Sequence, residues 1–291
     1  MLFTGTSERQ HPINPLHHLL AERLASLFSA LPQVVVIAVG GSLGSGTSDA
    51  ASDIDLYVYT REDIPLDDRR LIVEQAGGAS RLNLGLTFWG PGDEWIHAAS
   101  GLEIDAVYFD AAWMEAQIQR TFREHQASLG YSTCFAFTVR NSEIFYDPSG
   151  WFAAAQEICR QPYPEALRRN IIALNHPVLR GIIPSYNAQI EKAARRSDLV
   201  SLNHRLAALL ASYFDILFAL NRELHPGEKR LVEQAQSRCV HLPVDMPLDV
   251  AAVLVSSATG DPLLLARLAT LLDHLDQLLE QEGFDPQLLL P

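Results

Sequence analysis

Residues 52–58 read Ser-Asp-Ile-Asp-Leu-Tyr-Val, and apolar and polar side chains alternate along them. This alternation is typical of a strand with one buried face. Asp53 and Asp55 are two residues apart, so on a strand their side chains point to the same face, about 6–7 Å from each other. Two carboxylates this close repel each other unless a cation lies between them, and a divalent metal ion is the simplest one. The sequence therefore predicts a metal site on this strand.

A buried strand and a glycine turn precede these aspartates. Residues 34–39 are all apolar and predict a buried strand that runs into glycines at 40 and 41. A glycine turn followed by a hydroxyl residue exposes backbone N–H groups that bind anions, commonly phosphate. We therefore expect Gly41 and Ser42 to bind the phosphates of a nucleotide. Phosphate-binding groups beside metal-binding carboxylates indicate phosphoryl or nucleotidyl transfer.

This arrangement resembles the nucleotidyltransferase superfamily, which includes DNA polymerase beta and the aminoglycoside nucleotidyltransferases. The superfamily pattern is Gly-Gly or Gly-Ser, a short spacer, and then Asp-apolar-Asp-apolar. Here Gly41-Ser42 is followed, after ten residues, by Asp53-Ile54-Asp55-Leu56. The resemblance extends over residues 34–150 and implies Mg²⁺ or Mn²⁺ as cofactor and a nucleoside triphosphate as substrate.

The same resemblance implies a third acidic residue on a later strand. Residues 102–109 alternate Glu103 and Asp105 with apolar residues, and we choose Asp105 over Glu103. The resemblance then makes Asp53, Asp55 and Asp105 the catalytic metal ligands. The expected reaction is transfer of a nucleoside monophosphate to a hydroxyl of a small-molecule or protein acceptor.

Other functions remain open. Superfamily members often carry Arg shortly after Gly-Ser, whereas Ser45 stands there in this chain. A nucleotide-binding or regulatory module without turnover is therefore one alternative, and a toxin–antitoxin-type modifier of protein or RNA is another. Residues 40–44 also match the Gly-x-Ser-x-Gly elbow of serine hydrolases. That elbow normally follows several strand–helix units, and here one strand precedes it. The glycines lack the Gly-Lys-Ser/Thr of a P-loop.

Composition and charge favour a small-molecule acceptor over nucleic acid. The formal net charge of the 291 residues is −13, and a protein that grips a nucleic acid backbone is usually basic. The three cysteines, Cys134, Cys159 and Cys239, have no Cys-x-x-Cys spacing, which favours a reducing compartment. The N-terminus has no signal-peptide pattern, and no apolar stretch is long enough to span a bilayer. We expect a cytoplasmic protein; the sequence does not define its oligomeric state.

The order of patterns predicts an α+β fold: a nucleotidyltransferase-type mixed β-sheet with flanking helices, followed by an all-α helical bundle. The domains are expected at residues 1–150 and 151–291, a layout that resembles kanamycin nucleotidyltransferase. Strands are expected at 34–39, 54–59, 82–89 and 103–109, with one or two more between 133 and 146. Helices are expected at 15–30, 65–76, 111–126, 151–160, 164–179, 184–196, 199–224, 226–238, 247–257 and 262–282.

The helical half offers weaker signals. We expect Lys229 to lie one turn into a helix that begins at Pro226 and to contact the triphosphate; an ordinary exposed helix junction is the alternative. Arg169-Asn170, followed six residues later by His176, resembles the Arg…His signature of HEPN ribonucleases, although Pro177 disrupts the helix there. Three acidic residues qualify as the general base of the reaction: Glu191, Asp198 and Glu228.

Overall fold

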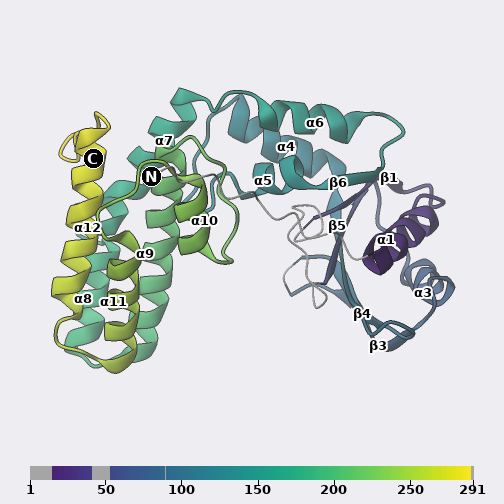
Figure 1. Cartoon of the computed structure of the whole chain (residues 1–291), viewed down its shortest axis with the longest axis horizontal. Helices are drawn as coiled ribbons and strands as arrows, with labels where there is room; N and C mark the ends of the chain where they lie inside the picture. Colours follow the sequence, from purple (N-terminus) through teal and green to yellow (C-terminus); the bar gives the residue numbers. More distant parts are fainter. Residues whose placement is uncertain (1–14, 41–52, 89, 290–291) are drawn as a thin grey trace, which may run out of the picture. The chain divides into compact units, whose positions relative to one another are not determined.

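The structure is a computed structural model that describes residues 15–40, 53–88 and 90–289. The chain divides into two compact units. Unit 1 consists of Met1–Ile118 and Thr138–Arg160, and unit 2 of Gln119–Phe137 and Gln161–Pro291. Figure 1 labels the elements of both units. Gly41 and Ser42, the expected phosphate-binding residues, lie outside the described residues.

A mixed six-stranded sheet forms the centre of unit 1 (Figure 1). Its strands are β1 (Val34–Val39), β2 (Ile54–Thr60), β3 (Ala79–Leu86), β4 (Gly92–His97), β5 (Glu103–Asp110) and β6 (Glu143–Tyr146). The strand order is β3-β4-β5-β2-β1-β6, with β2 and β5 parallel and the other neighbours antiparallel. The order brings β2 and β5, which are distant in sequence, side by side at the centre of the sheet.

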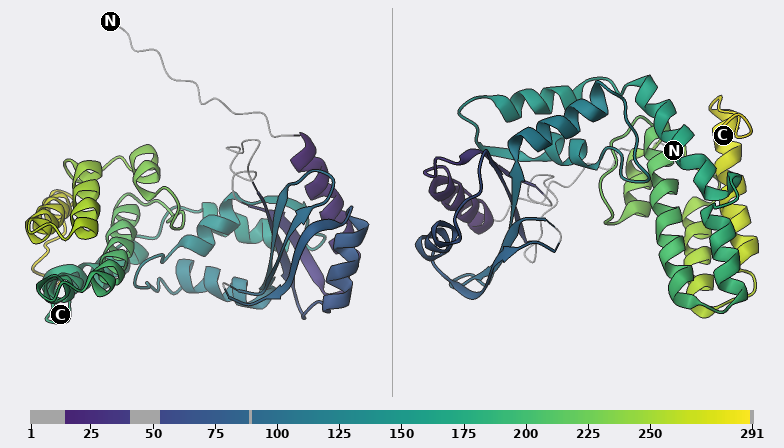
Figure 2. Two further views of the ribbon diagram at one scale, coloured as in Figure 1. Left: turned by 90° about the horizontal axis from the view of Figure 1, so that it is seen from below. Right: turned by 180° about the vertical axis from the view of Figure 1, so that it is seen from behind.

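Alternation along the central strands gives the sheet one apolar face. Ile54, Leu56 and Val58 of β2 are fully buried, and they pack in the same cluster as the alternate residues of β5. Helices α1 (Pro15–Phe28) and α3 (Leu66–Gln75) cover this face with their apolar sides, as both views of Figure 2 show. Burial of these aliphatic side chains, about 1.5–3 kcal/mol each, holds unit 1 together.

Aromatic side chains cover part of the opposite face. Tyr59 contacts Phe109 of β5, with ring centroids 5.5 Å apart, and Phe152 of α6 (Trp151–Arg160), with centroids 4.9 Å apart. Trp113 of α4 (Ala111–Phe122) stacks on Phe109. This end of the face is therefore closed and apolar. Tyr57 and Asp55, which precede Tyr59 by two and four positions on β2, lie on the same face of the sheet, toward the other end of that face.

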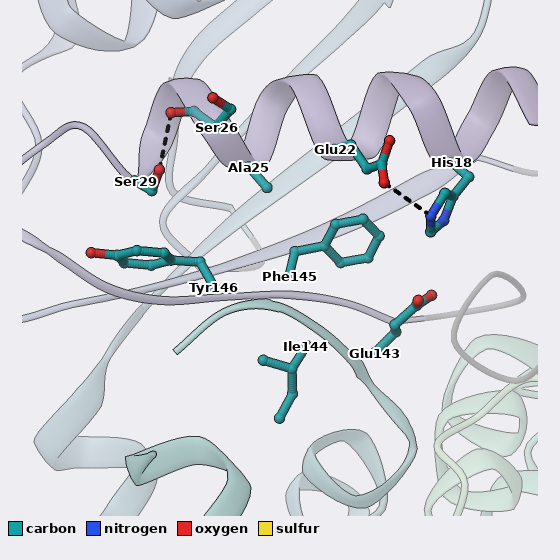
Figure 3. Close-up of a pocket in the computed structure, with 9 residues that line it drawn as sticks. All are labelled: His18, Glu22, Ala25, Ser26, Ser29, Glu143, Ile144, Phe145 and Tyr146. Atoms are coloured by element: carbon teal, nitrogen blue, oxygen red, sulfur yellow. Dashed lines mark hydrogen bonds and ion pairs between the residues drawn. The ribbon is translucent and has the colours of Figure 1, made fainter. Parts of the chain in front are cut away.

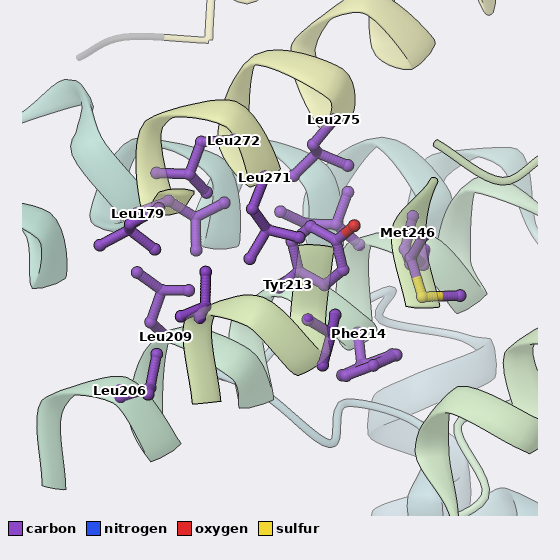
Figure 4. Packing of buried hydrophobic residues seen from close by; sticks show 14 of the residues in the cluster. Leu179, Leu206, Leu209, Tyr213, Phe214, Met246, Leu271, Leu272 and Leu275 are labelled. Carbon is purple, nitrogen blue, oxygen red and sulfur yellow. The ribbon is translucent and has the colours of Figure 1, made fainter. Parts of the chain in front are cut away.

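Unit 2 is a helical bundle built around one long apolar helix. Its elements are α7 (Glu165–His176), the π-helical turn η1 (Pro177–Gly181), α8 (Tyr186–Arg195), α9 (Leu199–Leu220), α10 (Leu231–Arg238), α11 (Met246–Thr259) and α12 (Leu264–Gln281). Twelve residues of α9 are buried, so this helix is the core of the unit. Figure 4 shows Tyr213 and Phe214 of α9 packed with leucines of α12. At its start, the Asp198 carboxylate accepts the Ser201 N–H at 3.0 Å and caps the helix.

The predicted fold class is confirmed: a mixed sheet with flanking helices is followed by a helical region. The domain boundary differs from the prediction at residue 150, since α6 belongs to unit 1. The Gln156 amide on α6 donates to the carbonyl oxygens of Val139 (2.9 Å) and Ser142 (2.7 Å), which fixes α6 to that unit.

The expectation of one or two strands between residues 133 and 146 is confirmed by β6, while residues 134–141 of this range form a helix, α5 (Cys134–Asn141). The structure buries Ala136 and Val139 of this helix, three residues apart, as a helix does. The expected start of one later helix is wrong. Helix α10 begins at Leu231 and not at Pro226, because Arg230 adopts a left-handed conformation (φ 56°) immediately before it.

Candidate functional site

A row of carboxylates crosses the open end of the second face of the sheet. Asp55 of β2 is the register partner of Asp105 of β5. Register partners on neighbouring strands point to the same face and lie about 4.8 Å apart. Both side chains are half-buried. The sheet thus brings together two of the three aspartates that the sequence predicts as metal ligands.

The row continues on both sides of this pair. Glu94 of β4 is the register partner of Asp105 on its other side. On the β1 side, the Gly40 N–H donates to the Asp55 carbonyl at 2.9 Å, so Gly40 extends β1 beside Asp55. The order across the sheet is therefore Gly40, Asp55, Asp105, Glu94. We name these four positions, the three carboxylates and the glycine at their β1 end, the acidic row.

The third predicted ligand is placed differently. Asp53 immediately precedes β2 and is exposed. Glu103, the rival of Asp105, is exposed at the start of β5. Among the described residues, no group of three His, Cys, Asp or Glu side chains is arranged to hold a metal ion. Asp55 and Asp105 nevertheless fit one end of such a site, since carboxylate oxygens from adjacent strands are the ligands that Mg²⁺ prefers.

Tyr57 lies beside the acidic row, two residues after Asp55 on β2 and on the same face of the sheet. Burial raises the pKa of Tyr57 far above its ordinary value, and the negative charges of Asp55 and Asp105 raise it further. The phenol is therefore neutral at physiological pH. Its ring lies against Phe109, with centroids 5.8 Å apart, which connects the site to the aromatic cover.

A small recess opens beside Glu94. Its volume is about 70 Å³, and Leu86, Pro91 and Val107 supply its apolar walls, while Glu94 and Asp105 supply its carboxylates. Sequence reasoning missed Glu94. Its neighbours Asp93 and Trp95 are buried on the opposite face, so a period of two in residues 93–96 was the available signal. The sequence does not show that β4 pairs with β5, and only that pairing places Glu94 beside Asp105.

Lys229 and the three suggested general bases lie at the surface of unit 2. Lys229 is exposed in the turn before α10, and not one turn into a helix. Of the three suggested general bases, Glu191 pairs with Arg195 at 2.5 Å, Asp198 caps α9, and Glu228 is exposed. His176, from the ribonuclease-like pattern, is buried and lies 2.7 Å from the Asp276 carboxylate.

A larger recess of about 380 Å³ lies between α1 and the edge strand β6 (Figure 3). His18 and Glu22 of α1 form an ion pair at 3.4 Å along one side of it, and residues 143–146 form the other side. Strand β1 separates β6 from β2. This recess is therefore distinct from the acidic row and contains none of the predicted site residues.

Residues 19–86 match the family model described as a nucleotidyltransferase domain. The match spans α1 to β3 and includes Asp53 and Asp55, so the resemblance expected from these residues is confirmed. Residues 19–86 are thus similar to a nucleotidyltransferase domain. Residues 132–231 match a second model, described only as a domain of unknown function, DUF4037. A comparison with curated proteins finds no match for the chain.

Three solved structures show a distant likeness. A nucleotidyltransferase-like protein from Exiguobacterium sibiricum is 14% identical, with a TM-score of 0.43, over 92% of this chain and 75% of its own. The CCA-adding enzyme of Thermotoga maritima, complexed with tRNA, is 12% identical (TM-score 0.33; 94% and 83% covered). The STING-associated c-di-GMP synthase CdnE of Capnocytophaga granulosa is 13% identical (TM-score 0.26; 94% and 83% covered). At these scores their substrates have no bearing on this chain. No helix in its described part is long and apolar enough to cross a membrane.

Proposed function

We propose that the protein is a metal-dependent nucleotidyltransferase that moves a nucleoside monophosphate from a nucleoside triphosphate to a hydroxyl of an acceptor. The observation that carries this proposal is the register of Asp55 with Asp105 on one face of the sheet. One of these residues lies in the segment that matches the nucleotidyltransferase domain model. Two adjacent carboxylates on half-buried strand positions repel each other, and a bound divalent cation removes that cost.

In this proposal Asp55 and Asp105, with Asp53 at the mouth of the site, hold Mg²⁺ or Mn²⁺. The metal would neutralise charge on the triphosphate and on the leaving pyrophosphate. Gly41 and Ser42 would contact the β- and γ-phosphates. They directly follow Gly40, the last described residue on the β1 side of the acidic row.

The surroundings of the row support transfer to an acceptor. The aromatic rings of Tyr59, Phe109 and Phe152 pack together at the other end of the same face and give the site an apolar border. Neutral Tyr57 adds no charge beside the two carboxylates. The net charge of −13 disfavours a polyanionic acceptor, and we therefore propose a small-molecule acceptor before nucleic acid.

The proposal is tested by supplying each of the four ribonucleoside triphosphates, labelled at the α-phosphate, with Mg²⁺ or Mn²⁺ and a panel of hydroxyl-bearing small molecules, tRNA and proteins. We expect label transfer and pyrophosphate release that depend on the metal. Asp55→Asn combined with Asp105→Asn abolishes both, whereas Glu74→Gln, an exposed carboxylate on α3, leaves them unchanged. Metal-dependent nucleotide binding without transfer to any acceptor or to water would instead identify a nucleotide-binding module.

A further inference from the structure

Glu94 and Asp93 are adjacent in sequence, but their carboxylates lie on opposite faces of the sheet. Asp93 is buried on the apolar face, where it accepts the Tyr108 hydroxyl at 2.6 Å and the Gly85 N–H at 2.7 Å, and it lies 3.6 Å from the Arg69 guanidinium. Its role is structural. Glu94 points to the other face, and within the described residues no hydrogen bond or ion pair engages its carboxylate.

The position of Glu94 carries an energetic cost. Like charges directly opposite each other on neighbouring antiparallel strands are destabilising, and Glu94 lies opposite Asp105. No described cation offsets this repulsion at Glu94. A carboxylate at such a position, with no partner for its side chain among residues 15–40, 53–88 and 90–289, is a candidate for contact with a ligand.

The recess beside Glu94 indicates the kind of group that it contacts. Its volume of about 70 Å³ is large enough for a hydroxymethyl group of a ligand or for two water molecules. Its walls at Leu86, Pro91 and Val107 are apolar. A carboxylate repels phosphate but accepts a hydrogen bond from a hydroxyl, so the recess suits a neutral hydroxyl-bearing group and not the triphosphate.

The order of the strands indicates the side from which the attacking oxygen approaches. Gly40 and Glu94 lie at opposite ends of the acidic row, with Asp55 and Asp105 between them. In phosphoryl transfer, the attacking and leaving oxygens lie roughly in line on opposite sides of the phosphorus. If the pyrophosphate leaves on the β1 side of the acidic row, as the proposed function has it, the attacking oxygen approaches from the β4 side, where Glu94 lies.

We infer that Glu94 binds the attacking hydroxyl and accepts its proton. This inference rests on the proposed function. In the step, the acceptor O–H bond breaks and its proton moves to a carboxylate oxygen of Glu94. The acceptor oxygen forms a bond to the α-phosphorus, and the bond between the α-phosphorus and the bridging oxygen breaks. Pyrophosphate leaves with that electron pair.

The test uses the full chain with Mn²⁺, α-labelled ATP, and glycerol at high concentration as the hydroxyl-bearing probe. Glu94→Gln and Glu94→Ala are expected to lower the turnover number for pyrophosphate release by about 100-fold or more, the usual contribution of a general base. Glu94→Asp retains part of the rate, and added formate restores part of it to Glu94→Ala. Calorimetry with a non-transferable α,β-methylene analogue of ATP should show nucleotide affinity within two-fold of wild type in all three. Glu74→Gln serves as the matched control.

Each outcome decides a different claim. If the Glu94 variants turn over as fast as Glu74→Gln, or if they lose affinity for the analogue, Glu94 is not the acceptor-side group and the inference is overturned, while the proposed function stands. If wild type neither binds the analogue with Mn²⁺ nor releases pyrophosphate, the proposed function fails and this inference fails with it. A slow Glu94→Ala variant with normal analogue affinity and formate rescue supports the inference.

Discussion

The ring of Tyr57 occupies the space beside Gly40 where any other residue would place its Cβ. A Cβ built at Gly40 would lie 2.2 Å from Cε2 of Tyr57 and 2.7 Å from Cζ. Glycine is therefore required at the end of β1 because of the neighbouring aromatic ring. The same contact holds Tyr57 against the last described residue before the expected phosphate-binding turn.

Gly40→Ala is expected to destabilise unit 1 by about 1–3 kcal/mol, the usual cost of overpacking a filled site. In a Tyr57→Ala background the same substitution should cost less by at least about 1 kcal/mol, because the two positions are in contact. Urea denaturation of the four proteins measures this coupling. Tyr57→Phe is the control, since it keeps the ring and so should keep the cost. Additive effects of Gly40→Ala and Tyr57→Ala would show that the contact is absent.

A second prediction concerns the buried carboxylate of Asp215 in α9. Burial raises the pKa of Asp215 to about 7, although hydrogen bonds from the Ser132 hydroxyl (2.6 Å) and N–H (3.0 Å) oppose this. The folded state therefore binds a proton that the unfolded state, with a carboxyl pKa of about 3.9, has already released. Stability falls as the pH rises between these two values, by up to about 1.4 kcal/mol per pH unit.

Asp215→Asn should remove this fall, so the stability of wild type relative to that of the variant should decrease from about pH 4 to pH 7. The titratable neighbours Tyr131, Cys134 and Tyr163 have raised pKa values and stay neutral throughout this range. Chemical denaturation of unit 2, followed at several pH values, measures the difference. A constant difference across the range would mean that Asp215 is ionised in the folded protein throughout.

The third prediction tests Lys229 as a triphosphate contact. Lys229→Ala should raise the dissociation constant of the Mn²⁺–nucleotide complex about ten-fold, since a hydrogen bond to a charged group contributes about 1.5–3 kcal/mol. Folding stability should change by less than about 0.5 kcal/mol, because Lys229 is exposed. Lys192→Ala, which removes an exposed lysine from α8, is the matched control. Equal affinities for the two variants in calorimetric titrations would leave Lys229 as a solvated surface residue.

Local patterns in the sequence were sufficient to predict the two central strands of the sheet, but not β4. Alternation at Ile54, Leu56 and Val58 defined β2 and its buried face, and the same period in residues 103–109 defined β5. Between residues 133 and 146 the patterns predicted one or two strands without bounds, and the structure has the strand β6 there, preceded by the helix α5. The pattern failed at Pro226, because a left-handed residue at 230 delays the helix start.

Only those residues of the candidate site that a local sequence pattern marks could be predicted. Asp53 and Asp55 lie two residues apart in one segment of sequence, and Asp105 follows from the resemblance. The place of Glu94 depends on β4 pairing with β5, which is a property of strand order and register. No periodicity within residues 92–97 encodes which strand lies beside them. Sequence reasoning therefore identified Asp55 and Asp105 and missed Glu94, the residue on the other side of Asp105.

The central claim is that Asp55 and Asp105 together bind a metal–nucleotide complex. The most direct measurement is the melting temperature of wild type, Glu74→Gln, and Asp55→Asn with Asp105→Asn, each with Mn²⁺, with the α,β-methylene analogue of ATP, and with both. A complex present at 100 times its dissociation constant stabilises by about 2.7 kcal/mol, which corresponds to a rise of several degrees. We expect this rise in melting temperature for wild type and Glu74→Gln only when both ligands are present, and no rise for the double variant. An equal rise in the double variant would contradict it.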